Sequence, residues 1–160
     1  MPALSDRART AVRALFVDRF GLDPRFFDSL RWIETNDEVW VVSAPPPDGV
    51  AHPRPPGLRA ARLHPAGIKP TSHFLTLLGQ RISRSQASVT LPQLRQILLG
   101  QRIAWMDDQI ADGFVAIRYS DDVFGCGVLR HGRLHTLIPT GRRHELLNIL
   151  DNTCINRTDL

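Results

Sequence analysis

The segment from Gly113 to Arg143 constrains the fold most, because it has the pattern of three short strands joined by two tight turns. Phe114–Tyr119 is rich in β-branched and aromatic residues, which favour strands. Two further extended runs, Val123–Leu129 and Leu134–Ile138, follow it. The residues between the runs are short and polar, basic, or glycine, a composition that suits turns. The segment therefore predicts a β-meander that ends in two arginines.

Two glycines lie inside the second of these strands, on either side of Cys126. They are Gly125 and Gly127. A glycine inside a strand usually marks a bulge, a tight bend or the close approach of two backbones. A small, sharply bent barrel needs such residues, so we expect the meander to belong to one.

Length and composition exclude several classes of protein. The chain has 160 residues, of which 42% are hydrophobic, enough for one ordinary domain or two small ones. No apolar run approaches the roughly 18 residues of a membrane span, and the N-terminal segment lacks the apolar core of a signal peptide. The two cysteines form neither a disulfide framework nor a zinc pattern. We therefore expect a cytoplasmic protein with no membrane partner.

The charge balance is basic and comes almost entirely from arginine. The formal net charge is +4, and nineteen of the twenty cationic residues are arginine, with Lys69 as the exception. The planar arginine fork suits phosphate and stacks on bases. A GC-rich genome would also explain the ratio of arginine to lysine, but it would not explain the excess of cations over acids. The charge is consistent with a nucleic-acid partner without requiring one.

The first half of the chain predicts two helices at its start. The first runs from its capping residue, Ser5, to about Phe20, with apolar residues on one face and arginines mostly on the other. Gly21 ends it. Asp23 and Pro24 have the residue types of a cap and a first helical position, so they begin a second, short helix.

Strands follow these helices. Residues 31–33 and 39–43 predict a hairpin, whose aromatic residues we assign to the core rather than to a base-stacking platform. A loop with six prolines, 44–57, leads to a strand at 58–64. A further helix then carries three apolar residues and ends at a glycine: Phe74, Leu77, Leu78 and Gly79.

A polar connector separates the two halves of the chain. Gln80–Gln86 contains two arginines and no acidic residue, which favours a boundary between two small domains. We expect an α+β fold, with a small α/β domain at residues 1–84, a β pseudo-barrel with short helices at 85–152, and a tail at 153–160.

The second half predicts short elements around the meander. A strand at 88–90 is followed by a helix that begins at Pro92 and ends at Gly100. After the meander, Glu145–Asp151 predicts a helix whose leucines pack against the barrel. From Asn152 onward we expect the chain to fray.

The order of these elements resembles a PUA domain, the small pseudo-barrel named after pseudouridine synthase and archaeosine transglycosylase. The resemblance is carried by Gly100–Ile103, by Gly113–Ile117 and by Asp122–Gly127, where such domains have a variable, apolar, Gly-x-Gly sequence. Upstream, Arg19–Phe27 and Trp40–Ser43 are similar to the pre-PUA domain, which precedes PUA in small ribosome-biogenesis proteins.

The resemblance extends to one group of RNA-modifying enzymes and covers roughly residues 10–145. Lys69–Thr71 and Gly132–Arg143 look like the C-terminal extensions of Sun/Fmu-type RNA cytosine methyltransferases. The sequence departs from many PUA domains at Ala111–Gly113, where those domains have Pro-Gly. The resemblance implies binding of structured ribosomal or transfer RNA in RNA modification or ribosome biogenesis. It also implies an RNA methyltransferase or a ribosome-assembly factor as partner.

The resemblance also implies where RNA binds. PUA domains usually contact RNA through the short helix, the loop after it and a strand near the C-terminus. A glycine lets a phosphate approach the backbone, and arginines beside it supply charge and paired donors. RNA binding predicts that four of the arginines, Arg95, Arg102, Arg142 and Arg143, converge around Gly100. The full set of predicted RNA-binding residues is Arg81, Arg84, Arg95, Gly100, Gln101, Arg102, Arg130, Arg133, Arg142 and Arg143.

The sequence contains no recognisable catalytic set, so we expect a non-catalytic protein without cofactor or metal. Cys126 lies between glycines in a strand and Cys154 lies in the tail, unlike the nucleophile of a cytosine methyltransferase. No βαβ series is long enough for that enzyme's cofactor fold. His131 and His135 are four residues apart, but in a turn and a strand they do not share a face for a metal. Asp121–Asp122 is typical of a turn.

A protein-interaction module is the alternative function. In that case the first half of the chain would dock a partner protein, and the arginines would only keep the protein soluble. This hypothesis predicts scattered arginines and an exposed apolar patch formed by Phe26, Phe27 and Trp32.

Overall fold

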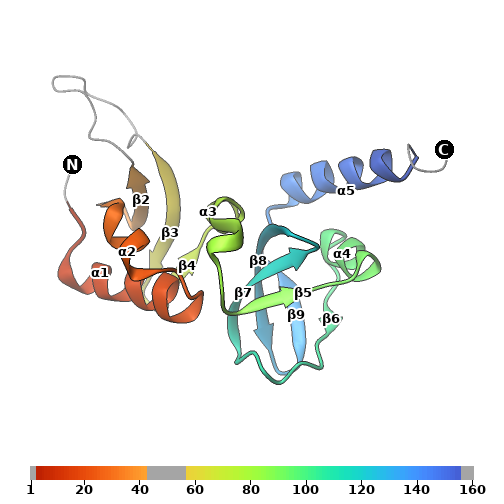
Figure 1. Cartoon of the computed structure of the whole chain (residues 1–160), viewed down its shortest axis with the longest axis horizontal. Helices are drawn as coiled ribbons and strands as arrows, with labels where there is room; N and C mark the ends of the chain where they lie inside the picture. Colours follow the sequence, from red (N-terminus) through yellow and green to blue (C-terminus); the bar gives the residue numbers. More distant parts are fainter. Residues whose placement is uncertain (1–2, 43–56, 156–160) are drawn as a thin grey trace.

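Two β-sheets, one from each half of the chain, form the framework of the protein (Figure 1). The computed structural model describes residues 3–42 and 57–155. The predicted proline-rich loop at 44–57 and the end of the predicted tail, 156–160, therefore fall almost wholly outside the described residues. The fold is α+β, as predicted, and the second sheet is curled into a half-barrel.

The N-terminal helix begins and ends where its sequence predicts. Ser5 caps α1 (Asp6–Arg13), and its Oγ accepts a hydrogen bond from the amide of Ala8 at 3.3 Å. The chain then continues as a π-helical segment, η1 (Ala14–Arg19). Gly21, with a φ of +69°, follows the helix and turns the chain toward α2.

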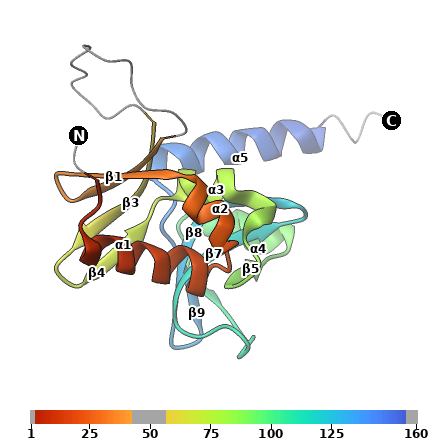
Figure 2. The ribbon, with the colours of Figure 1, turned by 60° about the vertical axis from the view of Figure 1, so that its left-hand side comes forward.

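The first sheet has the strand order β1-β2-β3-β4, and all of its neighbouring strands are antiparallel. α2 (Pro24–Ser29) leads into it, and α1 lies alongside β3 and β4 (Figure 2). The predicted hairpin and third strand are confirmed, whereas the edge strand β4 is short, contains glycine and proline, and is not predicted by the sequence. The strands are β1 (Arg31–Thr35), β2 (Glu38–Val42), β3 (Leu58–His64) and β4 (Gly67–Pro70).

The second sheet contains the predicted meander as β7-β8-β9. Its strand order is β5-β7-β8-β9-β6, with β5 and β7 parallel and the other pairs antiparallel. α3 (Ser72–Leu78) and η2 (Gly79–Arg81) connect the two sheets. The strands are β5 (Gln86–Ser88), β6 (Ile103–Ala104), β7 (Gly113–Tyr119), β8 (Asp122–Arg130) and β9 (Arg133–Thr136).

Two helices pack against the second sheet. α4 (Leu91–Leu98) is the predicted short helix. α5 (Thr140–Ile155) is longer than the helix predicted at 145–151, and the prediction that the chain frays from Asn152 is wrong. Within the described residues, no helix combines the length and hydrophobicity that crossing a bilayer requires. The apolar side of α5 packs on the sheet as predicted, through Leu146, Leu147 and Leu150.

The glycines of β8 lie where backbone and side chains approach closely, as predicted. At Gly125 the φ is +155°, and the register between β7 and β8 shifts nearby, between Ile117 and Arg118. A Cβ atom at Gly125 would lie only 2.6 Å from Cγ1 of Ile138. Gly127 is similarly crowded, because a Cβ atom there would lie 3.0–3.1 Å from its neighbours. The bend of the second sheet therefore depends on the absence of side chains at these two positions.

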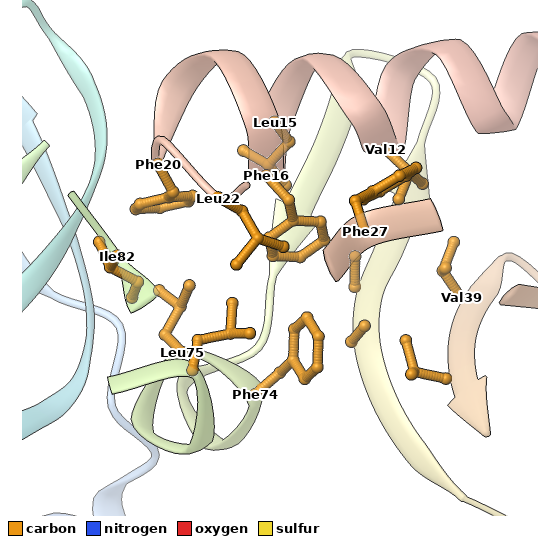
Figure 3. Packing of buried hydrophobic residues seen from close by; sticks show 14 of the residues in the cluster. Val12, Leu15, Phe16, Phe20, Leu22, Phe27, Val39, Phe74, Leu75 and Ile82 are labelled. Atoms are coloured by element: carbon orange, nitrogen blue, oxygen red, sulfur yellow. The ribbon is translucent and has the colours of Figure 1, made fainter. Parts of the chain in front are cut away.

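The two sheets share part of their hydrophobic core. The first cluster of buried residues lies between the first sheet and α1, α2 and α3 (Figure 3), and its aromatic members include Phe27 and Trp32, as predicted. It also contains Ala116, Val123 and Cys126 from the second sheet. Leu77 is not in this core; its side chain on α3 is exposed. The division of the chain at residues 84 and 85 stays a prediction.

Candidate nucleic-acid interface

The guanidinium group of Arg143 lies against the backbone at the end of α4. Gly100 has a φ of +84°, and a Cβ atom there would lie 2.6 Å from Nη1 of Arg143. That Nη1 donates a hydrogen bond to the Leu98 carbonyl at 3.2 Å, and Nη2 donates to Oγ1 of Thr140 at 3.0 Å. A cation at the C-terminal end of a helix is also favoured by the helix dipole. The contact holds one predicted arginine beside the predicted glycine.

Two further basic side chains lie close to Arg143. Arg102 is exposed immediately before β6, which pairs with β9 so that Ile103 lies opposite Leu134. His135, the next residue of β9, is half-buried. Its pKa is lowered, mainly by burial and also by the positive charges of Arg102 and Arg143. We call these four residues, Gly100, Arg102, His135 and Arg143, the Gly100 corner.

Buried nitrogen atoms without partners also belong to this corner. Nε of Arg143 and Nδ1 of His135 have no hydrogen-bond partner among the described residues. Buried polar groups are normally paired, so each such atom calls for an explanation. His135 was considered in the sequence only as a metal ligand. The strand register that brings it beside Arg102 comes from the pairing of β6 with β9, and β6 is only two residues long.

Stability should fall in mildly acidic solution because of His135. In the unfolded chain its imidazole protonates near the usual pKa of about 6.5, whereas in the folded protein burial and two arginines lower that pKa. The stabilising contribution is therefore complete above about pH 6.5 and is lost as the pH falls through that value toward the folded pKa. Thermal denaturation between about pH 7.5 and pH 5 should show a smaller loss of stability for His135→Gln than for the wild type. An equal loss in both proteins would contradict this assignment.

Arg95 and Arg142 make other contacts. Arg95, on α4, pairs with Asp151 of α5 at 2.5 Å. Arg142 pairs with Glu145 at 2.9 Å and lines a pocket of about 320 Å³ together with Asp121. Of the four arginines expected to converge around Gly100, the structure brings Arg143 against the glycine and Arg102 near it. Gln101 is exposed in the same loop.

The remaining predicted residues lie at two other places. Arg130 and Arg133 are opposite each other at the exposed turn between β8 and β9. Arg81 and Arg84 are exposed in the segment between α3 and β5, where they line a pocket of about 630 Å³ with residues of the first half. The ten predicted residues therefore do not form one continuous cluster.

The structure also shows the surroundings of the other residues considered above: Cys126, the residues that could bind a metal, and the loop before β7. Burial raises the pKa of the Cys126 thiol to about 12, so this thiol is not ionised at neutral pH. In the described part of the chain, no three or more histidine, cysteine, aspartate and glutamate residues are grouped so as to hold a metal ion. The loop at Ala111–Gly113 is tied down by Arg19, which donates hydrogen bonds to the carbonyls of Ala111 and Phe114 at 2.7 and 2.8 Å.

The apolar patch expected of a protein-interaction module does not exist in the predicted form. Phe27 and Trp32 are buried, with 0% and 4% exposure, and only Phe26 of that set is partly exposed. A largely apolar pocket of about 780 Å³ lies elsewhere, between α1, the β3–β4 turn and residues 112–114, and Arg19 is one of its lining residues.

Neither a search of protein-family models nor one of curated proteins finds a match to this chain.

Proposed function

We propose that the protein is a non-catalytic RNA-binding module of the PUA type that acts in the cytoplasm on ribosomal or transfer RNA. Its role is in RNA modification or ribosome biogenesis, with an RNA methyltransferase, which it would target to RNA, or a ribosome-assembly factor as partner. The observation that carries the proposal is the Gly100 corner, where Arg143 lies against Gly100 and the positive charges of Arg102 and Arg143 act on His135 in a basic protein.

Phosphate chemistry explains why this arrangement suits RNA. Arg102 is exposed and has no carboxylate within ion-pair distance among the described residues, so its donors are available to a phosphate. Arg143 is held in place by its contacts with α4, so it would lose little freedom on binding. A phosphate beside both arginines would offset their positive charges, which add to the effect of burial in lowering the pKa of His135.

Removing the two arginines of the corner should weaken binding of ribosomal RNA fragments and of unmodified transfer RNA. For the double variant Arg102→Ala/Arg143→Gln we expect at least about tenfold weaker binding, because two charge-assisted contacts are lost. Each phosphate contact adds about 0.7 to the salt slope for single strands, so the log–log slope should flatten by roughly 1.4 between about 50 and 200 mM salt.

A second double variant controls for the loss of charge alone. Arg25→Ala/Arg62→Gln also removes two positive charges, from side chains that are 93% and 52% exposed on the other half of the molecule. It should weaken binding by no more than about two- to threefold and leave the slope nearly unchanged. Equal effects of the two double variants, or no binding to either RNA at low salt, would refute the proposed function.

A further inference from the structure

The pocket beside Arg81 has the size and lining of a nucleotide site. Its volume is about 630 Å³, within the range of small-molecule pockets. One wall comes from the end of η1 and the turn at Gly21, and the other from residues 81–84. The pocket thus joins a π-helical segment, a feature often found at functional sites, to the connector between the two sheets.

A stacked pair forms one side of this pocket. The guanidinium carbon of Arg81 lies 4.0 Å from the centre of the Phe26 ring. Phe26 packs against the first core cluster, so the ring is a fixed platform, while Arg81 itself remains exposed. A guanidinium group that rests on an aromatic ring offers its other face to a base, and such stacking is a common mode of binding unpaired bases.

Hydrogen bonds fix the two walls to each other. The amides of Ser83 and Arg84 both donate to the Phe20 carbonyl, at 3.0 and 3.1 Å, and Oγ of Ser83 donates to the Gly21 carbonyl at 2.7 Å. A Cβ atom at Gly21 would overlap Oγ of Ser83, so only glycine lets the two segments approach this closely. The two walls therefore hold their spacing before any ligand arrives.

A carboxylate without a partner supplies the selective group. Asp18 lines the pocket, is exposed, and its carboxylate takes part in no hydrogen bond or ion pair within the described residues. Asp23 also lines the pocket, but its carboxylate caps α2 and contacts Arg25. Among the RNA bases, guanine alone presents two adjacent donors, N1–H and the N2 amino group, which one carboxylate can accept together.

We propose that this pocket binds an unpaired guanine nucleotide of the RNA, an inference that rests on the proposed function. The base stacks on Arg81, and the carboxylate of Asp18 accepts hydrogen bonds from N1–H and the N2 amino group. Arg84, an exposed residue of the pocket lining, contacts the phosphate. The site lies apart from the Gly100 corner and gives the module selectivity that phosphate contacts alone lack.

The test is a titration of the full chain with GMP, IMP, AMP and UMP, followed through the amide resonances of Gly21, Ser83 and Arg84. IMP is the matched ligand, because it differs from GMP only in lacking the N2 amino group. We expect GMP to bind about five- to tenfold more tightly than IMP, and still more tightly than UMP. Asp18→Ala should remove the preference for GMP over IMP. Arg81→Ala should weaken all four nucleotides about tenfold.

The outcomes separate this inference from the proposed function. Equal binding of the four nucleotides, or an Arg81→Ala variant that binds GMP as well as the control Arg62→Gln does, overturns the guanine site; Arg62 is exposed and does not line the pocket. If the guanine site is overturned but RNA fragments still bind through Arg102 and Arg143, the proposed function stands without a guanine site. Conversely, selective GMP binding without any binding of RNA fragments supports the guanine site and refutes the proposed function.

Discussion

Replacing Phe16 with alanine should lower the free energy of unfolding by about 3–5 kcal/mol. Phe16 is fully buried, with 0% exposure, at the junction of η1, the first sheet and α3 (Figure 3). Its ring centroid lies 5.7 Å from that of Trp32 and 5.1 Å from that of Phe74, which it meets edge-on. Alanine would leave a cavity between three elements that cannot all close around it. Urea denaturation followed by tryptophan fluorescence measures the loss.

Leu77 provides the matched control for this substitution. It lies on the same helix as Phe74, but its side chain is 61% exposed. Leu77→Ala should change the free energy of unfolding by no more than about 0.5 kcal/mol. If Phe16→Ala cost less than about 1 kcal/mol, or no more than Leu77→Ala, the first cluster would not be the main core of the protein.

Elements set by local chemistry could be predicted from the sequence. Ser5 and Asp23 cap their helices because a short side-chain oxygen can accept from a free amide of the first turn. The meander was predictable because its strands are joined by short turns; His131 and Gly132, for example, both have a positive φ, as a two-residue hairpin turn requires. In each case the decisive contacts join residues that are close in the sequence.

Elements that depend on distant contacts could not be predicted. β4 is a strand because residues 67–70 pair with β3 at a sheet edge, although glycine and proline do not favour a strand. The core shared by the two sheets also depends on contacts between residues far apart in the sequence. β8 packs against α3, and the amide of Cys126 donates a hydrogen bond to Oγ of Ser72, 54 residues away. Composition along the chain gives no signal for either contact.

The candidate site differs from its prediction mainly because the start of the last helix was predicted five residues too late. With a helix starting at Glu145, Arg142 and Arg143 would both belong to an extended basic segment. In the structure both lie in the first turn of α5, where consecutive residues point in directions about 100° apart. Arg143 therefore reaches Gly100, while Arg142 pairs with Glu145. To predict which arginine contacts Gly100, one must know at which residue the helix begins, because that decides the direction of each side chain.

Gly125 is the position where the curl of the second sheet leaves least room for a side chain. Its φ of +155° is one that other residues rarely adopt. A Cβ atom there would lie 2.6 Å from Cγ1 of Ile138, which is buried, and 3.0 Å from Cβ of Ser72 on α3. Ser72 also accepts the hydrogen bond from Cys126, so it cannot move away without losing a contact between α3 and the second sheet. Both the backbone and the packing therefore oppose any substitution.

Gly125→Ala should lower the free energy of unfolding by about 2–5 kcal/mol, the combined cost of overpacking and of an unfavourable backbone conformation. Gly141→Ala is the matched control, because Gly141 lies in the first turn of α5 and a Cβ atom there meets nothing within 4 Å. In a helix alanine is favoured over glycine, so this control should raise stability by up to about 1 kcal/mol. Denaturant titration of both variants measures the free energy of unfolding, which should decrease for Gly125→Ala and increase for Gly141→Ala. If Gly125→Ala were neutral, β8 would not approach α3 and Ile138 as closely as described, and α3 would not be joined to the second sheet at this point.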